Sequence, residues 1–162
     1  MSLTIDQMRL NPVARAGAVT LLSRCPSVVF TSGRRDRWKQ AEVMAQNSAL
    51  NRRWVGSTYL HAAAFQTWLD LHQEARTVEQ IAHGFYTLMA SMSDAELGAV
   101  SKHLGGNAFD VLPMVMDFAG TPTEAGHNVI EVVRSLDGLE KFLTKEGGLV
   151  RWHCQFDESE EV

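Results

Sequence analysis

Apolar side chains recur at helical spacing along much of this chain. Three segments carry helix-start signals. Asn11 precedes Pro12, which suits a first helical turn, while Thr77 stands three residues before Gln80 and Ser93 three residues before Glu96, each pair in a capping box. From residue 51 to residue 100 the pattern is helical, without a strand-like run. The spacing predicts helices over residues 12–24, 36–47, 59–71 and 77–89, and one or two more over residues 125–133 and 136–144.

Three short runs predict strands instead. Residues 27–32 are apolar and β-branched, and Gly33 ends this run. Residues 108–112 are apolar and alternate, and the next residue is a proline, which ends a strand ladder. Residues 149–156 form the third run, in which the odd-numbered side chains share one face.

Composition is that of an ordinary chain with one sizeable core. The 162 residues are 45% hydrophobic and 21% charged, which predicts a single domain. A net charge of −4 disfavours binding to nucleic acid or to anionic lipid. No stretch has the apolar length of a membrane span, and the first ten residues lack the pattern of a secretory signal, so we expect synthesis in the cytoplasm. Cys25 and Cys154 are expected to be core thiols.

A histidine and an aspartate seven residues apart are the first candidates for chemistry. His103 and Asp110 supply one imidazole and one carboxylate, and both ligand types bind zinc. A catalytic zinc site needs three protein ligands, and His153 in the third predicted strand is a candidate for the third. Without further support, a hydrogen-bonded histidine and aspartate beside a loop is the simpler interpretation of the first two residues.

Three blocks of sequence carry a family resemblance. The first block reads Ser-Gly-Arg-Arg with a downstream glutamine, the second Ser-x-His-x-x-Gly-x-Ala-x-Asp, and the third Trp-His. In this order the blocks resemble the zinc D-Ala-D-Ala carboxypeptidase and L-alanyl-D-glutamate endopeptidase family, which includes vancomycin-resistance dipeptidases and phage endolysins. The matching positions are Ser32, Gly33, Arg35 and Gln40, then Ser101, His103, Gly106, Ala108 and Asp110, then Trp152 and His153.

The resemblance implies both a fold and a metal site. It implies an α+β fold of the DD-peptidase and hedgehog type, in which a small antiparallel sheet carries the site and several helices pack around it. Residues 1–162 would form one such domain, with a helix-rich insertion at about residues 51–100. A zinc ion would be held by His103, Asp110 and His153.

The resemblance also implies roles for residues around the metal. Arg35 would bind a substrate carboxylate or stabilise an oxyanion, while Ser32, Gln40 and Ser101 would contact substrate. A surface arginine beside a turn and a solvated helix glutamine are the alternatives for Arg35 and Gln40. Arg34 stands where the family usually has tyrosine, so the aromatic contact of that tyrosine is not expected here.

One departure from the family concerns the general base. Family members usually carry an acidic residue three positions before the last ligand, and this chain has Val150 there, which cannot accept a proton. Glu146 is the best substitute, because the two glycines that follow it could swing its carboxylate over the metal. His127 and Asp157 are weaker substitutes.

The resulting hypothesis is a zinc peptidase that cuts a stem-peptide amide bond of peptidoglycan, as a carboxypeptidase or an endopeptidase. A protein made in the cytoplasm would reach that substrate after release, or as part of a virion beside other phage proteins, so a lytic phage or prophage role is expected. The alternative is a catalytically impaired, metal-bearing module that binds cell wall or builds a phage particle, and Val150 is its main support.

Overall fold

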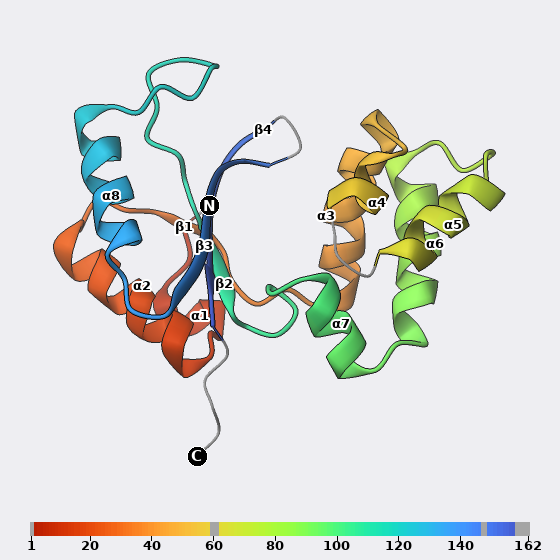
Figure 1. The fold of residues 1–162 in the computed structure, drawn as a ribbon, viewed down its shortest axis with the longest axis horizontal. Helices are drawn as coiled ribbons and strands as arrows, with labels where there is room; N and C mark the ends of the chain where they lie inside the picture. The colour runs from red at the N-terminus through yellow and green to blue at the C-terminus, as the bar shows by residue number, and fades with distance from the viewer. Residues whose placement is uncertain (1, 59–61, 147–148, 158–162) are drawn as a thin grey trace. The chain divides into compact units, whose positions relative to one another are not determined.

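The computed structural model describes residues 2–58, 62–146 and 149–157. The chain divides into two compact units, the first made of residues 1–34 and 106–162 and the second of residues 35–105. Among the described residues there are eight helices and four strands, and the strands form one antiparallel sheet. This confirms the predicted α+β class (Figure 1).

The sheet belongs to the first unit and has the strand order β1-β2-β4-β3. Its strands are β1 (Phe30–Ser32), β2 (Ala108–Val111), β3 (Leu139–Glu146) and β4 (Leu149–Phe156). β1 is shorter than the run predicted over residues 27–32, whereas β2 and β4 confirm the other two predicted strands. Although β4 comes last in the chain, it lies between β2 and β3 and pairs with both of them.

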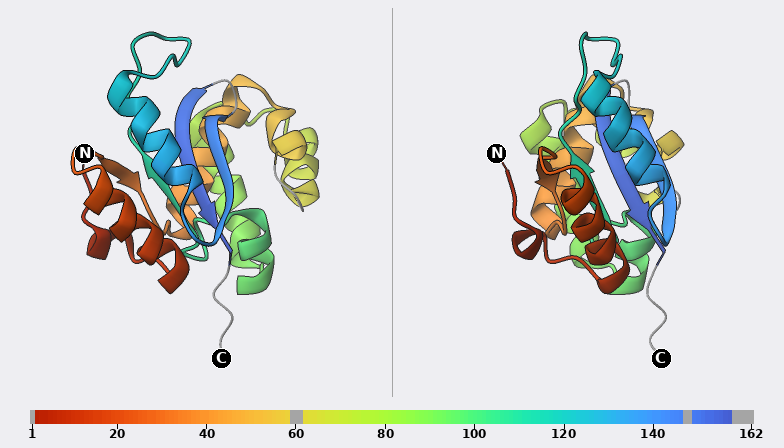
Figure 2. Two further views of the ribbon diagram at one scale, coloured as in Figure 1. Left: turned by 60° about the vertical axis from the view of Figure 1, so that its left-hand side comes forward. Right: turned by 90° about the vertical axis from the view of Figure 1, so that its left-hand side faces the viewer.

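Helices α1 (Ile5–Met8), α2 (Pro12–Arg24) and α8 (Glu124–Arg134) complete the first unit. Figures 1 and 2 show α2 and α8 side by side on one face of the sheet. Alternation along β4 sends Trp152, Cys154 and Phe156 into the core beneath these helices. His153 lies between Trp152 and Cys154 and therefore faces away from that core. As predicted, the side chains of Cys154 and His153 point to opposite faces of the sheet.

The second unit is a group of five helices. They are α3 (Arg37–Leu50), α4 (Trp54–Thr58), α5 (Ala63–Leu71), α6 (Val78–Ala90) and α7 (Asp94–Val100). Local side chains fix several of their starts: Asp36 caps α3, and Thr77 and Ser93 begin α6 and α7 with full capping boxes. The predicted helix-rich segment 51–100 lies entirely inside this unit.

One predicted helix is a strand, and another is described only in part. The helix predicted over residues 136–144 is wrong, because residues Leu139–Glu146 form β3 and pair with β4. The helix predicted over residues 59–71 is described only from Ala63 onward, and residues 59–61 lie outside the described part of the chain. Within the described ranges, no helix has both the length and the apolar character needed to span a membrane.

Candidate metal centre

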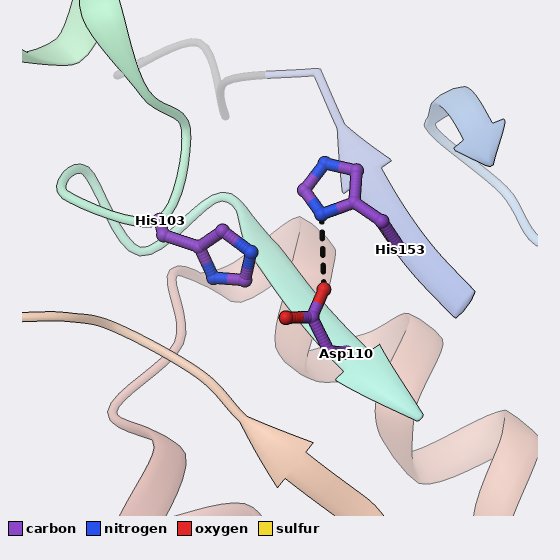
Figure 3. A group of neighbouring side chains, drawn as sticks. All are labelled: His103, Asp110 and His153. Carbon is purple, nitrogen blue, oxygen red and sulfur yellow. Dashed lines mark hydrogen bonds and ion pairs between the residues drawn. The ribbon is translucent and has the colours of Figure 1, made fainter. Parts of the chain in front are cut away.

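His103, Asp110 and His153 form a buried group that could hold a metal ion. One ligand atom from each residue lies within 4.8 Å of the other two, and the side chains are turned toward one another (Figure 3). The exposed fractions of these residues are 2%, 4% and 7%. Sequence blocks that are far apart in the chain are therefore brought together at this point.

The sheet register positions two of the three candidate ligands. Asp110 on β2 lies directly opposite His153 on β4, and Oδ1 of Asp110 is 3.0 Å from Nδ1 of His153. Ser32 on β1 lies opposite Asp110 on its other side. Directly opposed residues of an antiparallel pair project to the same face, so Ser32 belongs to the row that carries the candidate ligands Asp110 and His153.

His103 lies in the turn that leads into β2, as predicted. The hydroxyl of Ser101 accepts a hydrogen bond from the backbone N–H of His103 at 3.3 Å, and Ser101 is itself buried. The backbone N–H of Arg35 donates to the carbonyl of His103 at 3.0 Å. Both hydrogen bonds hold the backbone of His103 in place. The hydroxyl of Ser101 is thus in contact with the backbone of a candidate ligand.

Gly106 lies between His103 and Asp110 at a position that requires glycine. Its φ is +78°, a conformation that favours glycine, and a Cβ there would lie 2.5 Å from Nη2 of Arg34. The Arg34 guanidinium donates to the carbonyl of Arg9 and to the side chain of Asn11. Arg34 therefore anchors the N-terminal segment.

Asn11 connects that segment to the loop before β2. Its side-chain amide donates to Oδ1 of Asn107 at 2.9 Å, and its backbone N–H donates to the carbonyl of Gly106 at 2.9 Å. Asn11 is the N-cap residue of α2, as predicted, but its side chain makes no cap hydrogen bond. The side chain thus supports the loop between His103 and Asp110 instead of the helix.

His153 also has a polar neighbour on its Nε2 side. Oε1 of Gln155 lies 3.2 Å from Nε2 of His153, and Nε2 of Gln155 donates to Oε1 of Glu140 at 2.9 Å. Burial acts to lower the pKa of His153, but the hydrogen bond and charge of Asp110, the Gln155 hydrogen bond and the charge of Glu146 raise that pKa above its usual value. Gln155 and Glu140 were not among the predicted site residues, although the alternation of β4 places Gln155 on the same face as His153.

The donor set fits a zinc ion. Two imidazoles and one carboxylate leave one tetrahedral position open, which is the arrangement of catalytic zinc sites. Bonds of about 2.0–2.2 Å put tetrahedral ligand atoms about 3.3–3.5 Å apart, so the observed spacing of up to 4.8 Å requires short side-chain movements. The donor set alone does not distinguish zinc from other divalent transition metals.

Arg35 and Gln40 form a pair inside the second unit. Nη1 of Arg35 donates to Oε1 of Gln40 at 3.2 Å. Gln40 is completely buried in α3, which excludes the solvated helix position considered above. Arg35 is only half-buried, and Gln40 limits the positions that its guanidinium can take.

The candidate bases differ in their surroundings. Glu146 at the end of β3 has its carboxylate 3.9 Å from Nη1 of Arg151, and its charge is one cause of the raised pKa of His153. Val150 lies beside Gly120: a Cβ added at Gly120 would lie 3.1 Å from Cγ2 of Val150. His127 and Asp157 are exposed, and His127 projects from α8. The glycines 147 and 148 that would swing Glu146 lie outside the described residues.

Comparisons of the chain with protein-family models, with curated proteins and with solved structures found no match. The family resemblance therefore depends on the three sequence blocks alone.

Proposed function

We propose that this chain is a zinc-dependent peptidase that hydrolyses a stem-peptide amide bond of peptidoglycan. The observation that carries the proposal is the buried group of His103, Asp110 and His153, because the last two residues are 43 positions apart and come from separate blocks of the motif. If the short motifs matched by coincidence, these three side chains would not be expected to lie together in a buried position. Charged and imidazole groups are seldom buried together without a structural or functional cause.

In this proposal His103, Asp110 and His153 hold the zinc ion. When bound there, zinc polarises a carbonyl as a Lewis acid and lowers the pKa of water. The chain's own residues then fix the ligands in place: the Asp110 and His153 backbones are set by the sheet, and the His103 backbone by Ser101 and Arg35. Such preorganisation reduces the reorganisation that the reaction requires.

Arg35 is the proposed anchor for substrate. Its planar guanidinium suits bidentate binding of a carboxylate, or stabilisation of the oxyanion that develops as an amide is attacked. The Gln40 side chain holds one edge of the guanidinium, and the Arg35 backbone is tied to that of His103. These contacts limit how far the cation can move relative to the first candidate ligand, and stem peptides end in a carboxylate that such a cation binds.

Glu146 is the proposed general base. It is an acidic side chain on the strand beside β4, and its charge acts on His153. Arg151 forms an ion pair with the same carboxylate at 3.9 Å and would orient it. In this role the carboxylate accepts a proton from the attacking water and returns it to the leaving amine.

The substrate sets where such a protein would act. Peptidoglycan lies outside the cytoplasmic membrane, so the proposal includes release to the wall or incorporation into a virion, in a lytic phage or prophage setting. Partners in this proposal are the stem peptide and other virion proteins.

A second candidate is a metal-bearing module that binds the wall or builds a particle without turnover. The observation that favours it is Val150, which lies beside Gly120. A valine cannot accept a proton, and it occupies the position at which members of the resembled family usually carry their base. The two candidates share the metal site and differ only in proton transfer.

A digest of purified peptidoglycan tests the proposal. Zinc-loaded protein, the chelated protein and the variant His103→Ala would be incubated with walls of several chemotypes, and products and new amino termini identified by mass spectrometry. His83→Ala is the matched control, because His83 is an exposed histidine on α6. We expect products only from the zinc-loaded wild type and the control. Stoichiometric zinc binding without products on any wall would reject the peptidase in favour of the second candidate.

A further inference from the structure

Both ring nitrogens of His153 face a polar side chain. Nδ1 lies 3.0 Å from Oδ1 of Asp110, and Nε2 lies 3.2 Å from Oε1 of Gln155. Gln155 in turn donates from its own Nε2 to Oε1 of Glu140 at 2.9 Å. These four residues all belong to the first unit, on strands β2, β4 and β3.

The direction of these hydrogen bonds follows from what each group can donate. An ionised carboxylate only accepts, so Glu140 requires the NH₂ group of Gln155 to face it. The amide oxygen of Gln155 must then face His153, and an oxygen can only accept. Nε2 of His153 therefore carries a hydrogen. A metal ion cannot bind the nitrogen that carries this hydrogen, so Nδ1 is left as the ligand atom.

The sheet is irregular at the point where Glu140 meets Gln155. Leu139 pairs with Phe156 and Lys141 pairs with Gln155, so β3 has one more residue than β4 over this interval, and that residue is Glu140. A bulge of this kind re-aims a side chain, and bulges are common beside functional sites. Here the irregularity accompanies the hydrogen bond from Gln155 to Glu140.

We propose that Gln155 and Glu140 are a positioning pair that fixes the tautomer and the ring orientation of His153, so that Nδ1 is presented to the metal ion. The inference rests on the metal site of the proposed function but not on its reaction. Outer hydrogen-bond partners of this type orient a ligand histidine, and losing one weakens metal binding by about 10- to 100-fold.

Metal binding without any substrate tests the pair. The affinities for Zn²⁺ and Co²⁺ would be measured by competition with a chromophoric chelator. Long-range ¹H–¹⁵N spectra of the zinc-loaded protein would show which nitrogen of His153 carries the hydrogen. We expect hydrogen on Nε2 in the wild type. Gln155→Leu should weaken binding by about 10- to 100-fold and alter the Co²⁺ absorption spectrum.

A swap of the two side chains separates positioning from general damage to the sheet. Gln155→Glu alone should weaken binding, because it places a second carboxylate beside Glu140. Combining it with Glu140→Gln should restore most of the affinity, since the carboxylate at position 155 can accept both from Nε2 of His153 and from the amide NH₂ at position 140. Thr144→Val, at an exposed position of β3, is the control and should bind metal as the wild type does.

Two results would overturn the inference: unchanged metal affinity in Gln155→Leu, or coordination of zinc through Nε2 of His153 in the wild type. If the swap fails to restore affinity while circular dichroism shows an intact fold, pairing of the two side chains is also rejected. Loss of affinity in Gln155→Leu with rescue by the swap supports the inference even when no wall is digested. A wild type that binds no metal rejects both the inference and the proposed function.

Discussion

Asp110 and His153 face each other at 3.0 Å across β2 and β4, with side chains that are only 5% and 9% exposed. Each residue is both a candidate metal ligand and the hydrogen-bond partner of the other. A metal ion placed between them would replace a shared hydrogen. The pair therefore contributes to the folded chain with or without metal. Substituting Asp110 or His153 should change both the metal affinity and the free energy of unfolding, and the two effects can be measured separately.

Asp110→Asn keeps the size of the side chain but removes its charge. We expect metal affinity to fall by more than about 100-fold, since loss of an outer partner alone costs about 10- to 100-fold. Without metal, the free energy of unfolding should fall by about 1–3 kcal/mol, because buried His153 loses a charged partner. Chelator competition and urea unfolding measure the two effects, with exposed Asp137→Asn as the control. Wild-type affinity in Asp110→Asn would exclude this carboxylate as a ligand.

Glu146→Gln tests the proposed base. The rate of wall digestion should fall by about 10²- to 10⁴-fold while zinc affinity stays near that of the wild type, because Glu146 is not one of the three grouped ligands. Initial rates of product release measure this effect. Glu131→Gln, an exposed change on α8, serves as the control. An unchanged rate in Glu146→Gln would show that another group accepts the proton.

Gly84→Ala should destabilise the second unit although alanine is the better helix former. A Cβ at Gly84 in α6 would overlap the indole of Trp68, so we expect a loss of about 1–3 kcal/mol from overpacking. Gly98→Ala in α7 meets no heavy atom within 4 Å among the described residues and should gain up to about 1 kcal/mol. Thermal and urea unfolding compare the two variants. Equal effects would contradict the close contact with Trp68.

The loop between β2 and α8 should respond to acid through Asp117. Its carboxylate accepts a hydrogen bond from the backbone N–H of Thr121 at 3.0 Å, and this bond, with further N–H groups of the loop, lowers the pKa of Asp117 below 3.8. Because the folded pKa is the lower one, the stabilisation is complete above the unfolded pKa and is lost as pH falls through the folded pKa. NMR titration of Asp117 and of the Thr121 amide should show both changes. Asp117→Asn should abolish the low-pH transition of that amide.

Local chemistry made most helix starts predictable from sequence. Pro12 at the first turn of α2 and the capping box of Thr77 and Gln80 both depend on residues within one turn of each other. The error over residues 136–144 has a similarly specific cause. Leu139, Phe142 and Leu143 are spaced as on a helix face. In β3 the extra residue after Leu139 puts Leu139 and Phe142 on the core face, whereas Leu143 lies opposite His153 on the other face.

The three candidate ligands were predictable because a motif connects them, whereas their supports were not. Gln155 meets Glu140 only through the irregular register of β3 and β4, which no short pattern encodes. Asn11 and Asn107 are 96 positions apart and bond through one pair of amides. Long-range contacts between single polar side chains leave no periodic signal in a single sequence.

The place of β4 in the sheet has a consequence for synthesis. β4 follows β1, β2 and β3 in the chain, yet it occupies the position between β2 and β3, so a nascent chain cannot complete this sheet until β4 has left the ribosome. Asp110 cannot pair with His153 before β4 is made, so the candidate metal-binding group is absent from every shorter translation intermediate. Metal uptake would thus mark a finished sheet, and a partly made chain would carry none of the proposed hydrolytic chemistry.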